Sequence, residues 1–255
     1  MAYSIALAGK GGTGKTSITG LIVRYLIEKR RGPVLAVDAD ANANLNEILG
    51  VNVHATVGAM REQSMVTVRS GVERPGGMSM EELFDYSIQQ TLIESKGFDL
   101  LVMGRPEGPG CYCAANNIIR KYTDKLADTY PYVVMDNEAG LEHLSRRTTQ
   151  NVDLLLIISD PTVRGIMTAK RINDLCDELE LAIRRRGLII NRVTDNIEGD
   201  IKRLSEREGL SLFGIVPADD LIFEYDLQGK PLITLPEDSR ALRALYNILD
   251  ELMIP

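Results

Sequence analysis

Cysteine is scarce in this chain, with three residues among 255. Three thiols are too few for a disulfide framework. We therefore expect any special role for them to be metal binding or redox chemistry. Long apolar runs are also missing, and none reaches the roughly 20 residues that a membrane-spanning helix needs. The first residues carry neither a basic leader nor a small-residue cleavage site. These absences predict a cytoplasmic protein without a membrane partner.

Basic residues do not dominate the charge. The chain has 29 Lys and Arg against 36 Asp and Glu, a formal net charge of -7. Nucleic-acid binding requires clustered Lys and Arg to neutralise phosphates, and the one dense basic run, Arg184–Arg186, is short. We therefore expect no nucleic-acid partner. The hydrophobic content of 44% and the length predict one globular α/β domain over residues 1–255.

Short apolar runs alternate with longer segments of helical spacing. Several runs, such as Leu154–Ile158, are apolar at every position, which is typical of strands covered by helices on both faces. The alternation predicts a doubly wound, mainly parallel α/β sheet of about seven or eight strands. The expected strands are Ser4–Ala8, Pro33–Asp38, Phe98–Met103, Tyr132–Asp136, Val152–Ser159, Gly187–Asn191 and Leu212–Val216; the expected helices are Lys15–Arg30, Met80–Lys96, Arg164–Ala182 and Ser239–Met253; Arg69–Ser79 and Gly104–Gly110 are expected loops.

A glycine-rich segment follows the first expected strand and opens the first expected helix. Its sequence GKGGTGKT fits the pattern G-x-x-x-x-G-K-[ST] of a phosphate-binding P-loop. Glycines let successive N–H groups point at the phosphates, and the helix N-terminus adds its positive dipole end. Lys15 is expected to bridge the outer phosphates of ATP or ADP, and the Thr16 hydroxyl to ligate Mg²⁺. The expected nucleotide contacts are Gly9, Lys10, Gly11, Gly12, Thr13, Gly14, Lys15, Thr16 and Ser17.

A second lysine, Lys10, stands near the start of this loop. The sequence KGGTGKT resembles the deviant Walker A motif of the family that contains nitrogenase iron protein, MinD and ParA. The resemblance implies an ATPase that forms a homodimer, in which Lys10 reaches across to the partner's nucleotide as a catalytic residue. The alternative from the local pattern is a solvated lysine on a flexible loop.

Two further segments resemble the switches of that family. DADANAN at 38–44 is similar to switch I, which implies that Asp40 positions the attacking water and that Asp38 lies near Mg²⁺. An Asx-rich turn and helix cap is the alternative. DNEAG at 136–140 is similar to switch II, which implies that Asp136 is the Walker B carboxylate in the second shell of Mg²⁺. Gly140 would then turn its N–H toward the γ-phosphate, while Glu138 has no assigned role.

Asn191, Arg192 and Pro217 resemble the segments that surround the base in the same family. The resemblance implies that the Asn191 amide reads the adenine edge and that Pro217 lines the base. A capping asparagine is the alternative for Asn191. Together with the P-loop, these residues favour ATP over GTP.

Cys111 and Cys113 form a C-x-C pair directly after the expected loop at 104–110. Two thiolates can grip one soft metal ion, but a structural tetrahedral site takes four protein ligands. Cys176, His54 and His143 show no paired ligand spacing, whereas a two-fold axis between two C-x-C pairs would supply four thiolates. Thiolates suit Ni²⁺ and Zn²⁺ alike, and two small loop residues without a ligand remain the alternative.

The combination of KGGTGKT, DADANAN, DNEAGLEHLSR and CYC closely resembles the CooC-type maturation ATPases. That resemblance implies nickel delivery to carbon monoxide dehydrogenase or to acetyl-CoA synthase, with ATP hydrolysis coupled to metal release. One rival is an electron donor like nitrogenase iron protein, with an iron-sulfur cluster on the two-fold axis. Another is a positioning ATPase of the MinD or ParA kind, although the segment Ser239–Pro255 has two arginines and ends with acidic residues, and so matches neither a basic amphipathic anchor nor a DNA-binding surface.

Overall fold

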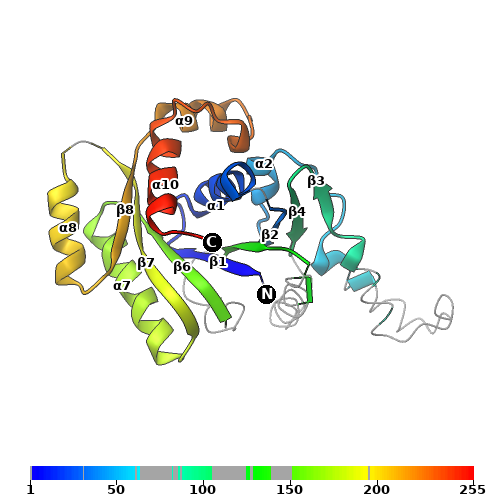
Figure 1. Cartoon of the computed structure of the whole chain (residues 1–255), viewed down its shortest axis with the longest axis horizontal. Helices are drawn as coiled ribbons and strands as arrows, with labels where there is room; N and C mark the ends of the chain where they lie inside the picture. The colour runs from blue at the N-terminus through cyan, green and yellow to red at the C-terminus, as the bar shows by residue number, and fades with distance from the viewer. Residues whose placement is uncertain are drawn as a thin grey trace.

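One eight-stranded sheet forms the centre of the computed structural model (Figure 1). The structure describes residues 2–30, 32–60, 62–63, 82, 86, 88–104, 125–126, 129–138, 151–194 and 196–255. The strand order is β3-β4-β2-β5-β1-β6-β7-β8, and every neighbouring pair except β3 with β4 is parallel. This confirms the doubly wound, mainly parallel sheet. The strands are β1 (Tyr3–Gly9), β2 (Val34–Ala39), β3 (Ile93–Ser95), β4 (Phe98–Val102), β5 (Tyr132–Asn137), β6 (Asn151–Ser159), β7 (Ala182–Val193) and β8 (Leu212–Pro217).

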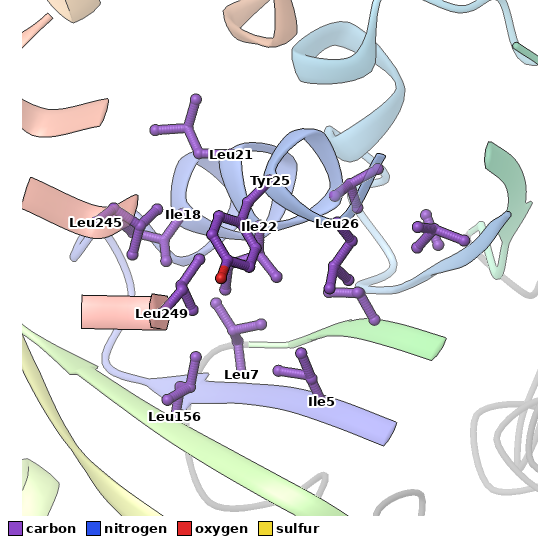
Figure 2. Packing of buried hydrophobic residues seen from close by; sticks show 14 of the residues in the cluster. Ile5, Leu7, Ile18, Leu21, Ile22, Tyr25, Leu26, Leu156, Leu245 and Leu249 are labelled. Carbon is purple, nitrogen blue, oxygen red and sulfur yellow. The ribbon is translucent and has the colours of Figure 1, made fainter. Parts of the chain in front are cut away.

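Helices cover both faces of this sheet (Figure 1). Residues alternate along β1, so that Ile5 and Leu7 point to one face while Ala6 and Ala8 point to the other. Figure 2 shows Ile5 and Leu7 beneath Ile22 of the P-loop helix. The helices are α1 (Lys15–Tyr25), which continues as the π-helix η1 (Leu26–Arg30), α2 (Leu45–Leu49), α7 (Val163–Glu178), α8 (Glu198–Arg207), α9 (Asp220–Leu227), the 3₁₀ helix η3 (Leu232–Thr234) and α10 (Arg240–Glu251).

The expected helix Met80–Lys96 is wrong at its C-terminal end. Ile93–Ser95 forms the antiparallel edge strand β3, which pairs with β4 through Ile93↔Leu100 and Ser95↔Phe98. Gly97 makes the tight turn between them with a left-handed φ of 89°. Glycine adopts this conformation without steric cost, so the chain reverses there and the short segment gains strand pairing.

The expected boundary between helix Arg164–Ala182 and strand Gly187–Asn191 is also wrong. The helix α7 ends at Glu178, and Glu180 takes a left-handed φ of 50° that no α-helix can continue. β7 then begins at Ala182, which pairs with Asn151, and Arg185 and Arg186 of the basic run also pair with β6. The periodicity of the sequence did not reveal this polar extension of the strand.

Close packing of α1 against α2 brings the segment after β2 next to the P-loop helix. A Cβ atom placed on Gly20 of α1 would lie 2.2 Å from Ile48 Cγ2 of α2. A side chain at position 20 would force Ile48 to move. Among the described residues, no helix is long and apolar enough to cross a membrane.

Asp219 stabilises the starts of two helices with one carboxylate. Its Oδ1 accepts the N–H of Leu221 in α9, while its Oδ2 accepts the Ser239 hydroxyl and the Ala241 N–H at the start of α10. Burial raises the pKa of Asp219, but the hydrogen bonds from Ala241, Ser239 and Leu221 outweigh it and hold this pKa below 3.8. The carboxylate therefore joins β8 to both C-terminal helices.

We expect Asp219→Ala to lower the free energy of unfolding by about 1–3 kcal/mol at pH 7, because two helix starts lose a capping acceptor. The folded pKa is lowered, so this stabilisation is present above the unfolded pKa and disappears as the pH falls through the folded value. Urea unfolding of both proteins at pH 7 and pH 3 measures the difference. The neighbouring exposed residue provides the control, Asp220→Ala. An equal loss in both variants would contradict the capping role.

Candidate nucleotide-binding site

The P-loop lies at the carboxyl edge of the sheet, where β1 turns into α1. Gly9 leaves the strand so close to β6 that a Cβ atom would stand 2.2 Å from the Ile158 carbonyl oxygen. Gly12 and Gly14 then adopt left-handed φ angles of 78° and 87°, and Gly14 caps α1. These glycines are required by the backbone itself. The resulting curl places the helix N-terminus at the edge where doubly wound sheets bind ligands.

Lys15 folds back over this loop. The residue is 7% exposed, and its Nζ donates to the Lys10 carbonyl at 3.5 Å. The same carbonyl accepts the Thr13 hydroxyl at 2.9 Å. Burial lowers the pKa of Lys15, while the charges of Asp136 and Asp40 oppose that shift. A partly desolvated ammonium at a helix N-terminus is suited to bind an anion such as phosphate. Lys10 itself is exposed.

Two buried carboxylates face the start of α1. Asp38 at the end of β2 and Asp136 at the end of β5 are Cα partners in adjacent parallel strands. Burial, together with the charge of Asp136, raises the pKa of Asp38 to about 7, against two hydrogen bonds from backbone N–H groups. Burial likewise raises the pKa of Asp136 to about 6, against the effects of the Thr16 hydroxyl and the Lys15 ammonium. The hydrogen bonds and the Lys15 ammonium therefore do not fully compensate the two buried carboxylates for the loss of water.

The oxygen atoms at this edge fit a magnesium ion. Within the described part of the chain, Asp136 Oδ1 is a buried oxygen without a hydrogen-bond partner. Carboxylate and hydroxyl oxygens are the ligands that hard divalent cations prefer, and Asp38, Asp136 and Thr16 supply both kinds. The described residues contain no cluster of three or more His, Cys, Asp or Glu side chains that could hold a metal. Asp38, Asp136 and Thr16 are therefore the described residues that could hold Mg²⁺ beside nucleotide phosphates.

The segment after β2 is fixed by its own aspartates. Asp38 Oδ1 accepts the Asp40 N–H at 3.1 Å, and its Oδ2 accepts the Leu45 N–H at 3.0 Å at the start of α2. Asp40 Oδ1 accepts the Asn42 N–H at 2.9 Å, which makes an Asx turn. The turn is thus present, whereas the N-cap residue Asn44 makes no capping hydrogen bond and Asp38 takes the first N–H of α2 instead. The water-positioning role of Asp40 stays a prediction.

Asn191 and Arg192 reach the P-loop from the end of β7. Asn191 Nδ2 donates to the Thr13 carbonyl at 2.9 Å, and an Arg192 guanidinium N–H donates to the Gly12 carbonyl at 2.9 Å. Pro217 lies alongside, because it pairs with Val193 across β7 and β8. Asn191 and Arg192 thus lie against the loop and Pro217 lies beside the same end of β7, and the contact of all three with a base stays a prediction.

Asn137 is a neighbour of the site that sequence reasoning missed. It directly follows Asp136, is fully buried, and donates from Nδ2 to the Leu7 carbonyl of β1 at 2.9 Å. Its place directly after Asp136 was the available signal. Several predicted features lie outside the described residues: Gly140, Cys111, Cys113, His143, the loop at 69–79 and the loop at 105–110.

We expect Asp136→Asn to raise the free energy of unfolding of the nucleotide-free protein by about 1–3 kcal/mol at pH 8, because it removes a desolvated charge. The folded pKa is raised, so the protonated carboxyl stabilises the fold at low pH, and that stability is lost as the pH rises from 3.8 through about 6. The gain should shrink at pH 5. Thermal unfolding without Mg²⁺ at both pH values measures it, with the surface variant Asp174→Asn as control. A less stable Asp136→Asn protein at pH 8 would refute the electrostatic account.

Comparison with known proteins agrees with this geometry. The model of the CobQ/CobB/MinD/ParA nucleotide binding domain matches residues 4–232. An uncharacterized ATP-binding protein of Methanocaldococcus jannaschii is 45% identical over 249 residues, which cover 98% of each chain. The carbon monoxide dehydrogenase accessory protein CooC of Rhodospirillum rubrum is 31% identical over 234 residues, which cover 88% of this chain and 87% of that protein.

Solved structures resemble the chain over nearly its whole length. The cell division ATPase MinD of Pyrococcus furiosus aligns with a TM-score of 0.73 at 21% identity and covers 99% of both chains. MinD of Pyrococcus horikoshii, complexed with Mg-ADP, aligns with a TM-score of 0.72 at 21% identity and covers 99% of this chain and 96% of that one. At this identity the likeness concerns the fold. Taken with the family match and the P-loop, these results place the chain in the CobQ/CobB/MinD/ParA nucleotide-binding family, as a P-loop ATPase.

Proposed function

We propose that this ATPase is a maturation factor that dimerises around ATP and delivers nickel to carbon monoxide dehydrogenase or acetyl-CoA synthase. The observation that carries the proposal is the C-x-C pair, Cys111 and Cys113, in a chain that is 31% identical to CooC over 88% of its length. Two such pairs across a two-fold axis would supply four thiolates to one cargo ion. Zn²⁺ binds the same ligands, so the nickel assignment depends on the relative.

The geometry of the nucleotide site supports the ATP-dependent part of this cycle. Lys15 is buried over the loop, ready to pair with phosphate oxygens, whereas Lys10 is exposed and free to extend toward a second subunit. Asp38, Asp136 and Thr16 would hold Mg²⁺, which supplies charge neutralisation at the phosphates. Asp40, beside this group, would orient the attacking water.

A positioning ATPase of the MinD or ParA kind is the second candidate. MinD of Bacillus subtilis is 25% identical over 254 residues, which cover 96% of this chain. Membrane positioning by a C-terminal helix would require a free amphipathic face. In α10, however, the apolar residues Leu242, Leu245 and Leu249 are buried in the core against α1 and β8. The apolar face of α10 is therefore not free to act as a membrane anchor.

We expect anaerobic titration with Ni²⁺ to produce thiolate-to-metal charge-transfer absorption that saturates at one metal per two chains. Cys111→Ala with Cys113→Ala should abolish it, because both thiolates of each subunit are lost. Cys176→Ala is the matched control, since Cys176 is a buried core thiol on α7. Light scattering in parallel gives the mass. Absence of the absorption, or its equal loss in the control, would exclude the shared thiolate site and leave the positioning role, whereas a purified protein with iron-sulfur absorption would indicate an electron donor.

We expect Asp40→Asn to reduce ATP hydrolysis by about 10²–10⁴-fold, because the amide cannot polarise water as a carboxylate does. The amide oxygen can still accept the Asn42 N–H, so the turn should persist. Phosphate release and Mg-ATP affinity, measured on the same samples, separate chemistry from binding. Asn42→Ala is the control, since it changes the other side chain of the turn and leaves the carboxylate in place. Hydrolysis at the parent rate in Asp40→Asn would remove Asp40 from the catalytic residues.

A further inference from the structure

β7 is irregular at the point where it passes the P-loop. Its pairing with β8 shifts register between Ile190 and Val193, and Arg192 takes a left-handed φ of 60°. A non-glycine residue in this conformation is strained and persists only when its surroundings hold it there. A β-bulge re-aims the side chains that it carries. We call Asn191 and Arg192, the two residues within this bulge, the P-loop latch.

The latch binds two successive carbonyl groups of the P-loop. Arg192 donates to the Gly12 carbonyl and Asn191 to the Thr13 carbonyl, each at 2.9 Å and across about 180 residues of sequence. The Asn191 side chain is also pressed against the next residue, since a Cβ atom on Gly14 would lie 2.5 Å from Asn191 Nδ2. Asn191 is 6% exposed, so this contact is largely shielded from water. Three consecutive loop residues are thus in contact with the bulge.

Fixing these carbonyls also fixes the direction of two N–H groups. In a trans peptide, the carbonyl of one residue and the N–H of the next point in opposite directions within one rigid plane. When the Gly12 and Thr13 carbonyls point to the latch, the Thr13 and Gly14 N–H groups must point away from it. A P-loop uses such N–H groups to cradle phosphates. The latch therefore orients donors that it does not itself touch.

We propose that Arg192 is a positioning residue for ATP binding, which acts through the Gly12 peptide to hold the phosphate cradle open before nucleotide arrives. Asn191 does the same at the Thr13 peptide. The left-handed backbone of Arg192 is the strained conformation that aims its guanidinium at the loop. This inference rests on the ATPase activity of the family and is independent of any metal cargo.

The test uses Arg192→Gly, because glycine accepts a φ of 60° and the substitution removes the side chain without straining the bulge. The matched control is Glu180→Gly, which removes a charged side chain at a left-handed φ of 50° in the turn after α7. Three quantities are measured in each protein: amide exchange at Thr13 and Gly14 without nucleotide, by NMR; binding of ATP and of inorganic tripolyphosphate; and the thermal midpoint.

We expect Arg192→Gly to accelerate amide exchange at Thr13 and Gly14 and to weaken ATP and tripolyphosphate binding equally, by about five- to tenfold, as for loss of one solvent-exposed hydrogen bond. The thermal midpoint of Arg192→Gly should stay unchanged, and its KM for ATP should rise while kcat is retained. The conservative variant Arg192→Lys should recover part of the affinity for ATP. Unchanged amide exchange with weaker ATP binding would overturn the proposal, because it would indicate direct contact with the ligand. A loss confined to ATP, with tripolyphosphate unaffected, would overturn it in favour of base recognition.

Discussion

Between β1 and α1 the chain turns through glycines whose backbone no other residue would adopt easily, and the rest of the site is arranged around that turn. Gly9 is in contact with β6, and Gly14 is in contact with the Asn191 amide of β7. A side chain at either position would separate the loop from the sheet. Gly9 meets the backbone of β6 and Gly14 meets the side chain of Asn191, so the orientation of the phosphate-binding N–H groups depends on both neighbouring strands. The neighbouring strands then decide which side chains can meet a phosphate here.

This arrangement buries three charged side chains, which raises the free energy of the nucleotide-free protein. Lys15, Asp38 and Asp136 are all less than a tenth exposed. Burial lowers the pKa of Lys15 and raises the pKa of both aspartates, so it favours the neutral form of each side chain. Their mutual attraction does not cancel the cost, because the carboxylates also repel each other. A triphosphate with its cation would supply the missing opposite charges to all three. The nucleotide-free site therefore contains buried charges without full compensation, and this favours binding of a triphosphate with its cation.

Local features of the sequence predicted most of the fold and the position of the site. The P-loop is a continuous segment, and the fully apolar runs report strands buried on both faces, so neither depends on distant partners. The Arg192 contact with Gly12 depends on a bulge in β7 and on a loop about 180 residues away, and nothing near either residue encodes it. The strand Ile93–Ser95 was mistaken for helix, because its pairing with β4 outweighs a helical pattern in so short a segment.

The P-loop helix has little freedom to move within this fold. Tyr25 at its end donates to Asp250 at 2.6 Å, and Tyr246 of α10 donates to Glu28 at 2.8 Å. The two tyrosine rings also pack edge to face at 5.1 Å. In contrast, the segment after β2 is tied to the site through Asp38, whose two oxygens accept the N–H groups of Asp40 and Leu45. A cation held by Asp38 would share these oxygens with that segment, which would link ligand binding to the position of Asp40 through one carboxylate.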